Sequence, residues 1–149
     1  AMSNPSEKAL RQAVETFWET FPPYWHRVRA HIRQAAAERY GISVDQFHIL
    51  RNIRHGQASV SELAEAKNIS RPAISQGVDV LVNKGFITRT TDERDRRHVR
   101  LDLTPAGNAA LEAVFEDTHR WMMETLAPLS EAEVDALVRG METLRKINP

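Results

Sequence analysis

Residues 59–107 read SVSELAEAKNISRPAISQGVDVLVNKGFITRTTDERDRRHVRLDLTPAG, and this stretch decides the fold. Ser59 stands three positions before a glutamate, which is the spacing of a helical capping box. Ser70 stands two positions before Pro72, as an N-cap residue does when proline occupies the first turn. Asn68, between the two, can take the left-handed conformation that ends a helix. The sequence therefore predicts two short helices joined by a very tight turn.

Two stretches that alternate apolar and polar residues follow the second helix, which spans residues 70–84 and should end at Gly85. FITRTT (86–91) and HVRLDL (98–103) have the period-two pattern of half-buried strands. Between and partly overlapping them, DERDRRHVR carries four arginines, a histidine and three acids, without the glycine of a two-residue hairpin turn. This pattern predicts an extended, charged wing with its tip at residues 92–97.

The order of a short helix, a tight turn, a second helix and a hairpin is that of a winged helix, which places its second helix in the major groove of DNA. Residues 43–107 resemble the multiple-antibiotic-resistance regulator (MarR) family of winged helix-turn-helix transcription factors, and DERDRRHVRLDLT is the most specific part of the resemblance. Lys67 and Gly77 depart from it, because similar sequences usually carry apolar side chains at both positions. Gly77 costs about 1 kcal/mol relative to alanine in mid-helix, so it indicates either close packing or a mobile helix.

Helical periodicity continues on both sides of this module. Apolar residues recur at spacings of three and four over residues 10–36, with an interruption at Pro22–Pro23 that favours either two helices or a kink near Pro22. SVDQ (43–46) has the spacing of another capping box and should start a short helix. After the wing, capped starts at Thr104 and Ser130 predict two further helices.

The expected fold class is mainly α, an α+β winged helix flanked by long helices. The expected organisation is N-terminal dimerisation helices at 1–40, a winged helix-turn-helix DNA-binding module at 41–104 and C-terminal dimerisation helices at 105–149. The flanking helices carry more apolar surface than a module of about sixty residues can cover. The side chains that most need a partner are Trp18, Phe21, Trp25, Leu137, Met141 and Leu144.

The family resemblance implies that these terminal helices interleave in a two-fold homodimer. Such a pair places two recognition helices about one DNA turn apart on a pseudo-palindromic operator. The resemblance also implies a repressor, although repression or activation depends on where the operator lies. A winged helix used only for protein–protein contact is the alternative function.

One face of the second helix is predicted to meet DNA. Ile74, Val78 and Leu81 share the face that packs on the core. The opposite face supplies the DNA-binding candidates, which are Ser70, Arg71, Pro72, Ala73, Ser75 and Gln76. Gln76 can pair with adenine through two hydrogen bonds, and Arg71 can reach guanine or phosphate. The alternative interpretation is that these residues are only caps and solvated surface.

Acids among the arginines of the wing can hold guanidinium groups in a fixed geometry. In similar proteins an Asp-x-Arg unit presents its arginine to the minor groove, and Asp95 with Arg97 matches that spacing. A narrow minor groove attracts arginine through its negative potential, so Arg97 is the leading candidate. Arg96 is predicted to contact phosphate or to serve as the alternate, and Arg94 is a further DNA-binding candidate. A solvated charge cluster is the alternative.

Charge is distributed unevenly in a chain with no net charge. Residues 1–50 carry a charge of +1, residues 51–100 carry +4 and residues 101–149 carry −5. A basic segment is the footprint of a module that binds a polyanion, so double-stranded DNA is the expected partner.

Several function classes are excluded by what the 149 residues lack. The absence of cysteine excludes disulfides, thiolate catalysis and cysteine-ligated zinc. The six histidines show no metal-binding spacing, so neither a metal nor a cofactor is expected. No GxSxG, HExxH or glycine-rich phosphate loop is present, so the chain is not expected to be an enzyme. No apolar run reaches the roughly 18 to 20 residues that cross a membrane, and a cytoplasmic protein is expected.

The resemblance further implies a pocket for a small aromatic or phenolic effector between the dimerisation helices and the winged helix. Aromatic and basic side chains that suit an aromatic acid are the candidates. They are Tyr24, Trp25, His26, Arg29, Phe47, His48, Phe115 and His119. Each is also compatible with an ordinary core or surface position.

Overall fold

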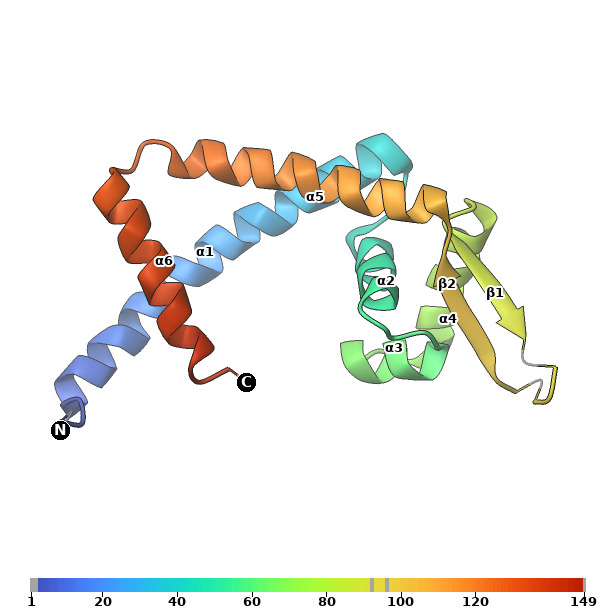
Figure 1. Cartoon of the computed structure of the whole chain (residues 1–149), viewed down its shortest axis with the longest axis horizontal. Helices are drawn as coiled ribbons and strands as arrows, with labels where there is room; N and C mark the ends of the chain where they lie inside the picture. The colour runs from blue at the N-terminus through green and yellow to red at the C-terminus, as the bar shows by residue number, and fades with distance from the viewer. Residues whose placement is uncertain (1–2, 92, 96, 149) are drawn as a thin grey trace.

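The computed structural model describes residues 3–91, 93–95 and 97–148, which form six helices and one two-stranded antiparallel sheet. The elements are α1 (Glu7–Tyr40), α2 (Val44–Arg54), α3 (Val60–Lys67), α4 (Arg71–Asn83), β1 (Ile87–Thr91), β2 (Val99–Leu103), α5 (Pro105–Leu126) and α6 (Glu131–Arg145). The long helices α1 and α5 cross above α2, and the hairpin projects at one end while α6 and both termini lie at the other (Figure 1). The predicted winged-helix fold class is confirmed.

The hydrophobic core lies where the second half of α1, the first half of α5 and helices α2 to α4 meet. Phe47 and Leu50 of α2 are 1% and 0% exposed and stand at its centre, with Leu63, Val78 and Leu111 packed around them. Burying each such side chain contributes about 1.5–3 kcal/mol. The first half of α1 and all of α6 contribute no buried residue.

Helix α1 runs through Pro22–Pro23 without a break. Two separate helices, one of the expected alternatives, are therefore wrong, while a kink within the helix stays a prediction. Each proline removes one backbone donor, but this stretch of α1 is largely exposed, so water can reach the carbonyls left without a partner. Packing of Val28, Ile32 and Ala36 against the core holds the second half helical.

The predicted helix caps are present, with one difference. Ser43 and Ser130 form complete capping boxes. Ser59 accepts from the backbone N–H of Glu62, but the Glu62 carboxylate accepts from the N–H of Ala58 at 3.2 Å and not from that of Ser59. The predicted second box is therefore only half formed. Ser59 has a φ of −138°, against −79° at Ser43, and this more extended backbone turns its N–H away from the glutamate.

The turn between α3 and α4 and the end of α4 follow the sequence prediction. Asn68 has a φ of 53° and is the left-handed residue that ends α3. Gly85 has a φ of 80°, and the N–H of Phe86 donates to the carbonyl of Leu81 at 2.9 Å. This backward hydrogen bond closes α4 and directs the chain into β1.

The two strands pair in the register that sets Ile87 opposite Leu103 and Thr91 opposite Val99. Ile87 and Leu101 are 2% and 0% exposed, so the base of the hairpin is part of the core. The N–H of Leu101 also donates to the carbonyl of Ala58 at 2.8 Å, which ties the wing to the segment before α3. The wing is therefore held by the helices it projects from.

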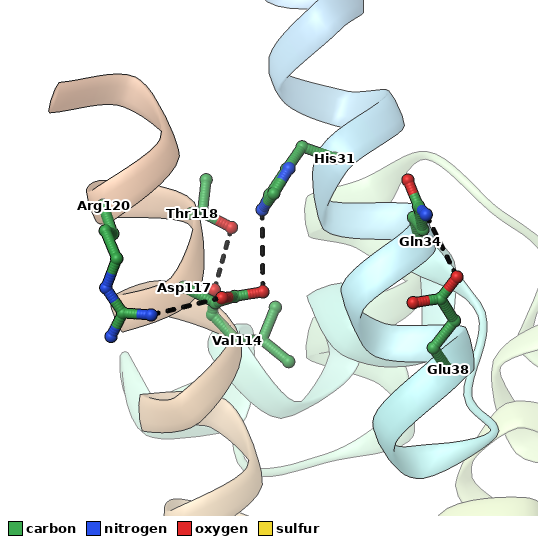
Figure 2. A network of polar contacts seen from close by, with 7 residues as sticks. All are labelled: His31, Gln34, Glu38, Val114, Asp117, Thr118 and Arg120. Carbon is green, nitrogen blue, oxygen red and sulfur yellow. Dashed lines mark hydrogen bonds and ion pairs between the residues drawn. The ribbon is translucent and has the colours of Figure 1, made fainter. Parts of the chain in front are cut away.

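Polar contacts, which Figure 2 shows, and an aromatic stack join α1 to α5. Nε2 of His31 lies 3.6 Å from Oδ2 of Asp117, and Nη1 of Arg120 lies 3.8 Å from the other oxygen of that carboxylate. The ring of His31 stacks on Trp121 with centroids 5.0 Å apart. These contacts fix the crossing of α1 and α5. Within the described residues, no helix is both long and apolar enough to cross a membrane.

Candidate nucleic-acid interface

Helix α4 has the two faces that the sequence predicted. Ile74, Val78 and Leu81 are buried in the core. Among the six DNA-binding candidates of this helix, Ser75 is half-buried. The exposed ones are Ser70, Arg71, Pro72, Ala73 and Gln76. The hydroxyl of Ser70 also accepts from the N–H of Ala73 at 3.4 Å, so this side chain serves as the N-cap.

Gly77 brings the backbone of α4 close to α2. A Cβ atom placed on Gly77 would lie 2.7 Å from Cδ1 of Ile49, closer than real side-chain contacts allow. Of the two interpretations of this mid-helix glycine, the structure therefore favours close packing. This close packing against α2 fixes the orientation of α4 and therefore the direction in which its exposed face points.

An ion pair that sequence reasoning missed joins α4 to the wing. The guanidinium of Arg89 on β1 donates to the carboxylate of Asp79 on α4. Both side chains are partly exposed, so the pair contributes at most about 1 kcal/mol to stability. Its geometric effect is to tie the hairpin to the helix beside it. The sequence carries no signal for this contact, because it depends on the angle between a helix and a strand.

The tip of the wing contains the predicted contact between Asp95 and Arg97. Oδ1 of Asp95 accepts from the backbone N–H of Arg97 at 3.1 Å and from its Nε at 3.2 Å. The Arg97 side chain is nevertheless 92% exposed, so its guanidinium is oriented and faces solvent. His98 adds a third contact, with Nε2 at 3.5 Å from Oδ2 of Asp95. Arg94 is exposed beside this pair, and the predicted Arg96 lies outside the described residues.

Hydrogen bonds also set the protonation of Asp95. The backbone N–H of Arg97 and then its guanidinium lower the pKa of this carboxyl below its ordinary value. A lowered pKa means that the contact forms above that pKa and is lost as the pH falls through it. Asp95 is therefore ionised, and Arg97 is held, at any pH near neutrality.

Comparison with known proteins gives the family. The MarR family model matches residues 42–99. The Bacillus subtilis HTH-type transcriptional regulator YpoP is 30% identical over 106 residues, which cover 70% of this chain and 75% of YpoP. The chain belongs to the MarR family.

Two other matches extend the comparison. The B. subtilis HTH-type transcriptional repressor MdtR is 33% identical over 98 residues, which are 65% of this chain and 63% of MdtR, less than two thirds of that protein. A solved MarR family protein from Bacillus stearothermophilus has a TM-score of 0.77 at 22% identity, covering 98% of this chain and 97% of its own. That structure shares the whole fold.

Membership of the MarR family settles the broad function. The chain is a transcriptional regulator with a DNA-binding winged helix, and it is not an enzyme. MarR-family regulators bind DNA as dimers.

Among residues 3–91, 93–95 and 97–148, no group of three or more histidine, aspartate or glutamate side chains is arranged to hold a metal ion.

Four of the eight effector candidates form one chain of rings between α2 and α5. The Phe47 and Phe115 rings are 5.3 Å apart with an angle of 67° between their planes. His48 lies 5.9 Å from Phe47, and His119 lies 6.3 Å from Phe115. The pKa of the His48 imidazole is lowered mainly by burial, then by the positive charges of Lys67 and Arg51, and then by that of Arg29. The Nε of Arg29 is buried and has no hydrogen-bond partner among the described residues.

The other three candidates lie apart from this ring chain. Tyr24 stacks on Trp121, with ring centroids 6.3 Å apart, and its hydroxyl lies 3.0 Å from Oγ1 of Thr125. Trp25 stacks on Phe21 along the outside of α1, and His26 is exposed. The structure therefore does not bring all eight candidates of one chain together, and their role in binding an effector stays a prediction.

A titration of Asp95 checks the geometry of the MarR wing. In the intact chain we expect the carboxyl pKa of Asp95, followed by nuclear magnetic resonance, to lie below its ordinary value of about 3.9. In Arg97→Ala it should rise only part of the way, because the backbone N–H of residue 97 remains. The pKa of Glu133, lowered by the backbone and hydroxyl of Ser130, should not move and serves as the control. An ordinary Asp95 pKa in the intact chain would contradict the wing contact.

Proposed function

We propose that this chain is an effector-responsive repressor that binds a pseudo-palindromic operator as a homodimer. Helix α4 enters the major groove and the wing enters the minor groove. Residues 41–104 form the DNA-binding module, and residues 1–40 and 105–149 supply the dimerisation helices. The similarity to the repressor MdtR supports repression as the mode of action.

The observation that carries the DNA-binding geometry is the orientation of Arg97 by Asp95. A free arginine on a loop loses side-chain entropy when it enters a groove. Arg97 is already held by two hydrogen bonds to one carboxylate oxygen while its guanidinium remains exposed. This preorganisation supports a contact with the minor groove, whose negative potential attracts arginine.

The apolar surface of the terminal helices supports the homodimer. The side chains of Trp18, Phe21 and Met141 are 66%, 50% and 61% exposed in the single chain. A groove of about 660 Å³ between α1 and α6 is lined mostly by apolar residues, among them Phe17 and Leu137. Apolar surface on this scale marks an interface. We infer that a second copy of the chain covers it.

The ring chain between α2 and α5 supports an aromatic effector. Phe47, Phe115 and the two histidines offer ring faces and edges, and Arg29 brings a positive charge beside them. An effector bound there would contact α2, which packs directly on α4 through Ile49. Its binding would thereby affect the position of the recognition helix.

Selection of bound DNA from a random pool, followed by affinity measurement on the selected site, tests the proposal. Arg97→Ala is expected to weaken binding to that site by about 1–3 kcal/mol, because it removes the oriented guanidinium from the minor groove. Arg139→Ala on α6 removes the same charge far from the wing and should leave the affinity unchanged. Equal affinity of the Arg97 variant and the parent protein at low and high salt would refute the role of the wing.

A further inference from the structure

A second cleft, separate from the ring chain, opens between α2 and α4. It has a volume of about 320 Å³, at the small end of the range for ligand pockets. Its polar lining residues include Asp45, Gln46, Lys67 and Gln76. Its apolar lining is aliphatic, and no aromatic ring stands among the lining residues that the structure describes. The space therefore suits a small, non-aromatic molecule with a polar end.

Both positions at which this chain departs from the pattern of similar sequences line the same cleft. Lys67 ends α3, and Gly77 lies at the middle of α4. An apolar side chain at residue 77 would occupy space on this side of α4 and press on Ile49, another lining residue. A lysine at residue 67 places a positive charge where an apolar group would pack. The two departures together create a cleft with a charge in its wall.

Among the described residues, the ammonium group of Lys67 forms no ion pair, although Asp45 lies close enough to act on its pKa. The side chain is half-buried, and no hydrogen bond or ion pair joins it to any residue that the structure describes. Burial is the main cause that lowers its pKa; Asp45 opposes this shift, and the smaller effect of Arg29 adds to it. His48, which Lys67 and Arg51 also affect, has its pKa lowered in the same way. Around His48, three cations act against Asp45 alone, and a bound anion would relieve that repulsion.

A hydrogen-bond donor stands in the same wall. Oε1 of Gln46 accepts from the backbone N–H of Ser43 at 2.9 Å, as part of the capping box of α2. This bond fixes the orientation of the amide and leaves its –NH₂ group to donate elsewhere. Asp45 lies nearby and repels a dianion more strongly than a monoanion. A single carboxylate therefore fits the cleft better than a phosphate dianion.

We propose that this cleft binds a short aliphatic carboxylate. The ammonium of Lys67 supplies the counter-charge, the amide of Gln46 donates a hydrogen bond, and the aliphatic wall around Ile49 packs on the hydrocarbon chain. Gln76 belongs both to the cleft and to the predicted DNA face, so occupancy also affects DNA binding. That last step rests on the proposed function, whereas binding of the carboxylate itself does not.

Lysine resonances of the intact protein test the site without DNA. The chain has four lysines, Lys8, Lys67, Lys84 and Lys146, and reductive ¹³C-methylation labels each while retaining its charge. Titration with pentanoate should shift the Lys67 signal saturably and leave the other three unmoved. Inorganic phosphate should shift none of them to the same extent. No shift at Lys67, a uniform shift of all four, or an equal response to phosphate would each overturn the site.

Matched variants link the site to regulation. Lys67→Gln should abolish saturable pentanoate binding measured by calorimetry, while Lys8→Gln should retain it. For the selected DNA site, saturating pentanoate should lower the affinity of the parent protein by about fivefold or more and leave Lys67→Gln unaffected. Saturation of Lys67 with no change in DNA affinity would overturn the coupling alone. Failure of pentanoate to bind, with DNA binding intact, would overturn the carboxylate site and leave the proposed function standing.

Discussion

Trp18→Glu is expected to convert the proposed homodimer into a monomer and to lower affinity for the selected DNA site by more than about 100-fold. Trp18 is 66% exposed in the single chain and stands in the apolar stripe of α1 with Phe17 and Phe21. In a dimer the glutamate would be buried without a partner, which costs several kcal/mol. Two linked half-site contacts raise affinity by about 100-fold or more over one, and a monomer loses that gain.

Gln12→Glu is the control for this substitution. Gln12 is exposed on the same helix, and its spacing of nine residues from Phe21 places it on the opposite side of the helix from that ring. It adds the same charge and should leave both the mass and the affinity unchanged. Sedimentation velocity at micromolar concentration measures the assembly, and circular dichroism checks that the winged helix is still folded. A dimeric Trp18→Glu protein with full DNA affinity would show that the α1 stripe is not the interface.

Local signals in the sequence predicted much of the fold correctly. Ser43, Ser70 and Asn68 have chemistry that acts on their own backbone or that of the next turn, so their roles depend little on the rest of the protein. The buried face of α4 also follows from spacing alone, because Ile74, Val78 and Leu81 lie on one side of any helix.

Features that depend on tertiary packing were not predictable in the same way. Pro22–Pro23 favours a break by local rules, yet the core contacts of the second half of α1 outweigh the local cost. The ion pair of Asp79 with Arg89 depends on how a helix and a strand lie against each other. In both cases the missing information is the position of another element, which no local pattern contains.

The same difference between local signals and tertiary packing applies to the candidate site. The contact of Asp95 with Arg97 spans two residues, and the resemblance to similar proteins, whose Asp-x-Arg spacing these two match, predicted it. The effector candidates were chosen by residue type, and the structure brings Phe47, His48 and Phe115 together but places Trp25 on the outside of α1. Residue type alone does not give the angle of a side chain around a helix relative to a distant partner.

The junction of the wing and α5 depends on a glycine whose substitution should be strongly destabilising. A Cβ atom on Gly107 would lie 2.1 Å from the carbonyl oxygen of Phe86 and 3.0 Å from its carbonyl carbon. These are backbone atoms, and they are held in place, since the same oxygen accepts from the N–H of Thr104 at 3.1 Å. The hydroxyl of Thr104 also accepts from the N–H of Gly107 at 3.0 Å. Relief of the clash would therefore require separating α5 from the base of the hairpin.

We expect Gly107→Ala to lower the free energy of unfolding by about 3 kcal/mol or more, measured by urea denaturation at a fixed protein concentration. Asn108→Ala, at an exposed position in the same turn, is the control and should change it by no more than about 0.5 kcal/mol. Helix α5 packs on the core of the winged helix and also belongs to the proposed dimerisation helices. Because the clash displaces α5, any folded Gly107→Ala protein should also bind the selected DNA site more weakly. Unchanged stability of this variant would mean that α5 can shift away from Phe86 at little cost. It would contradict the inference that α5 is held rigidly against the base of the hairpin.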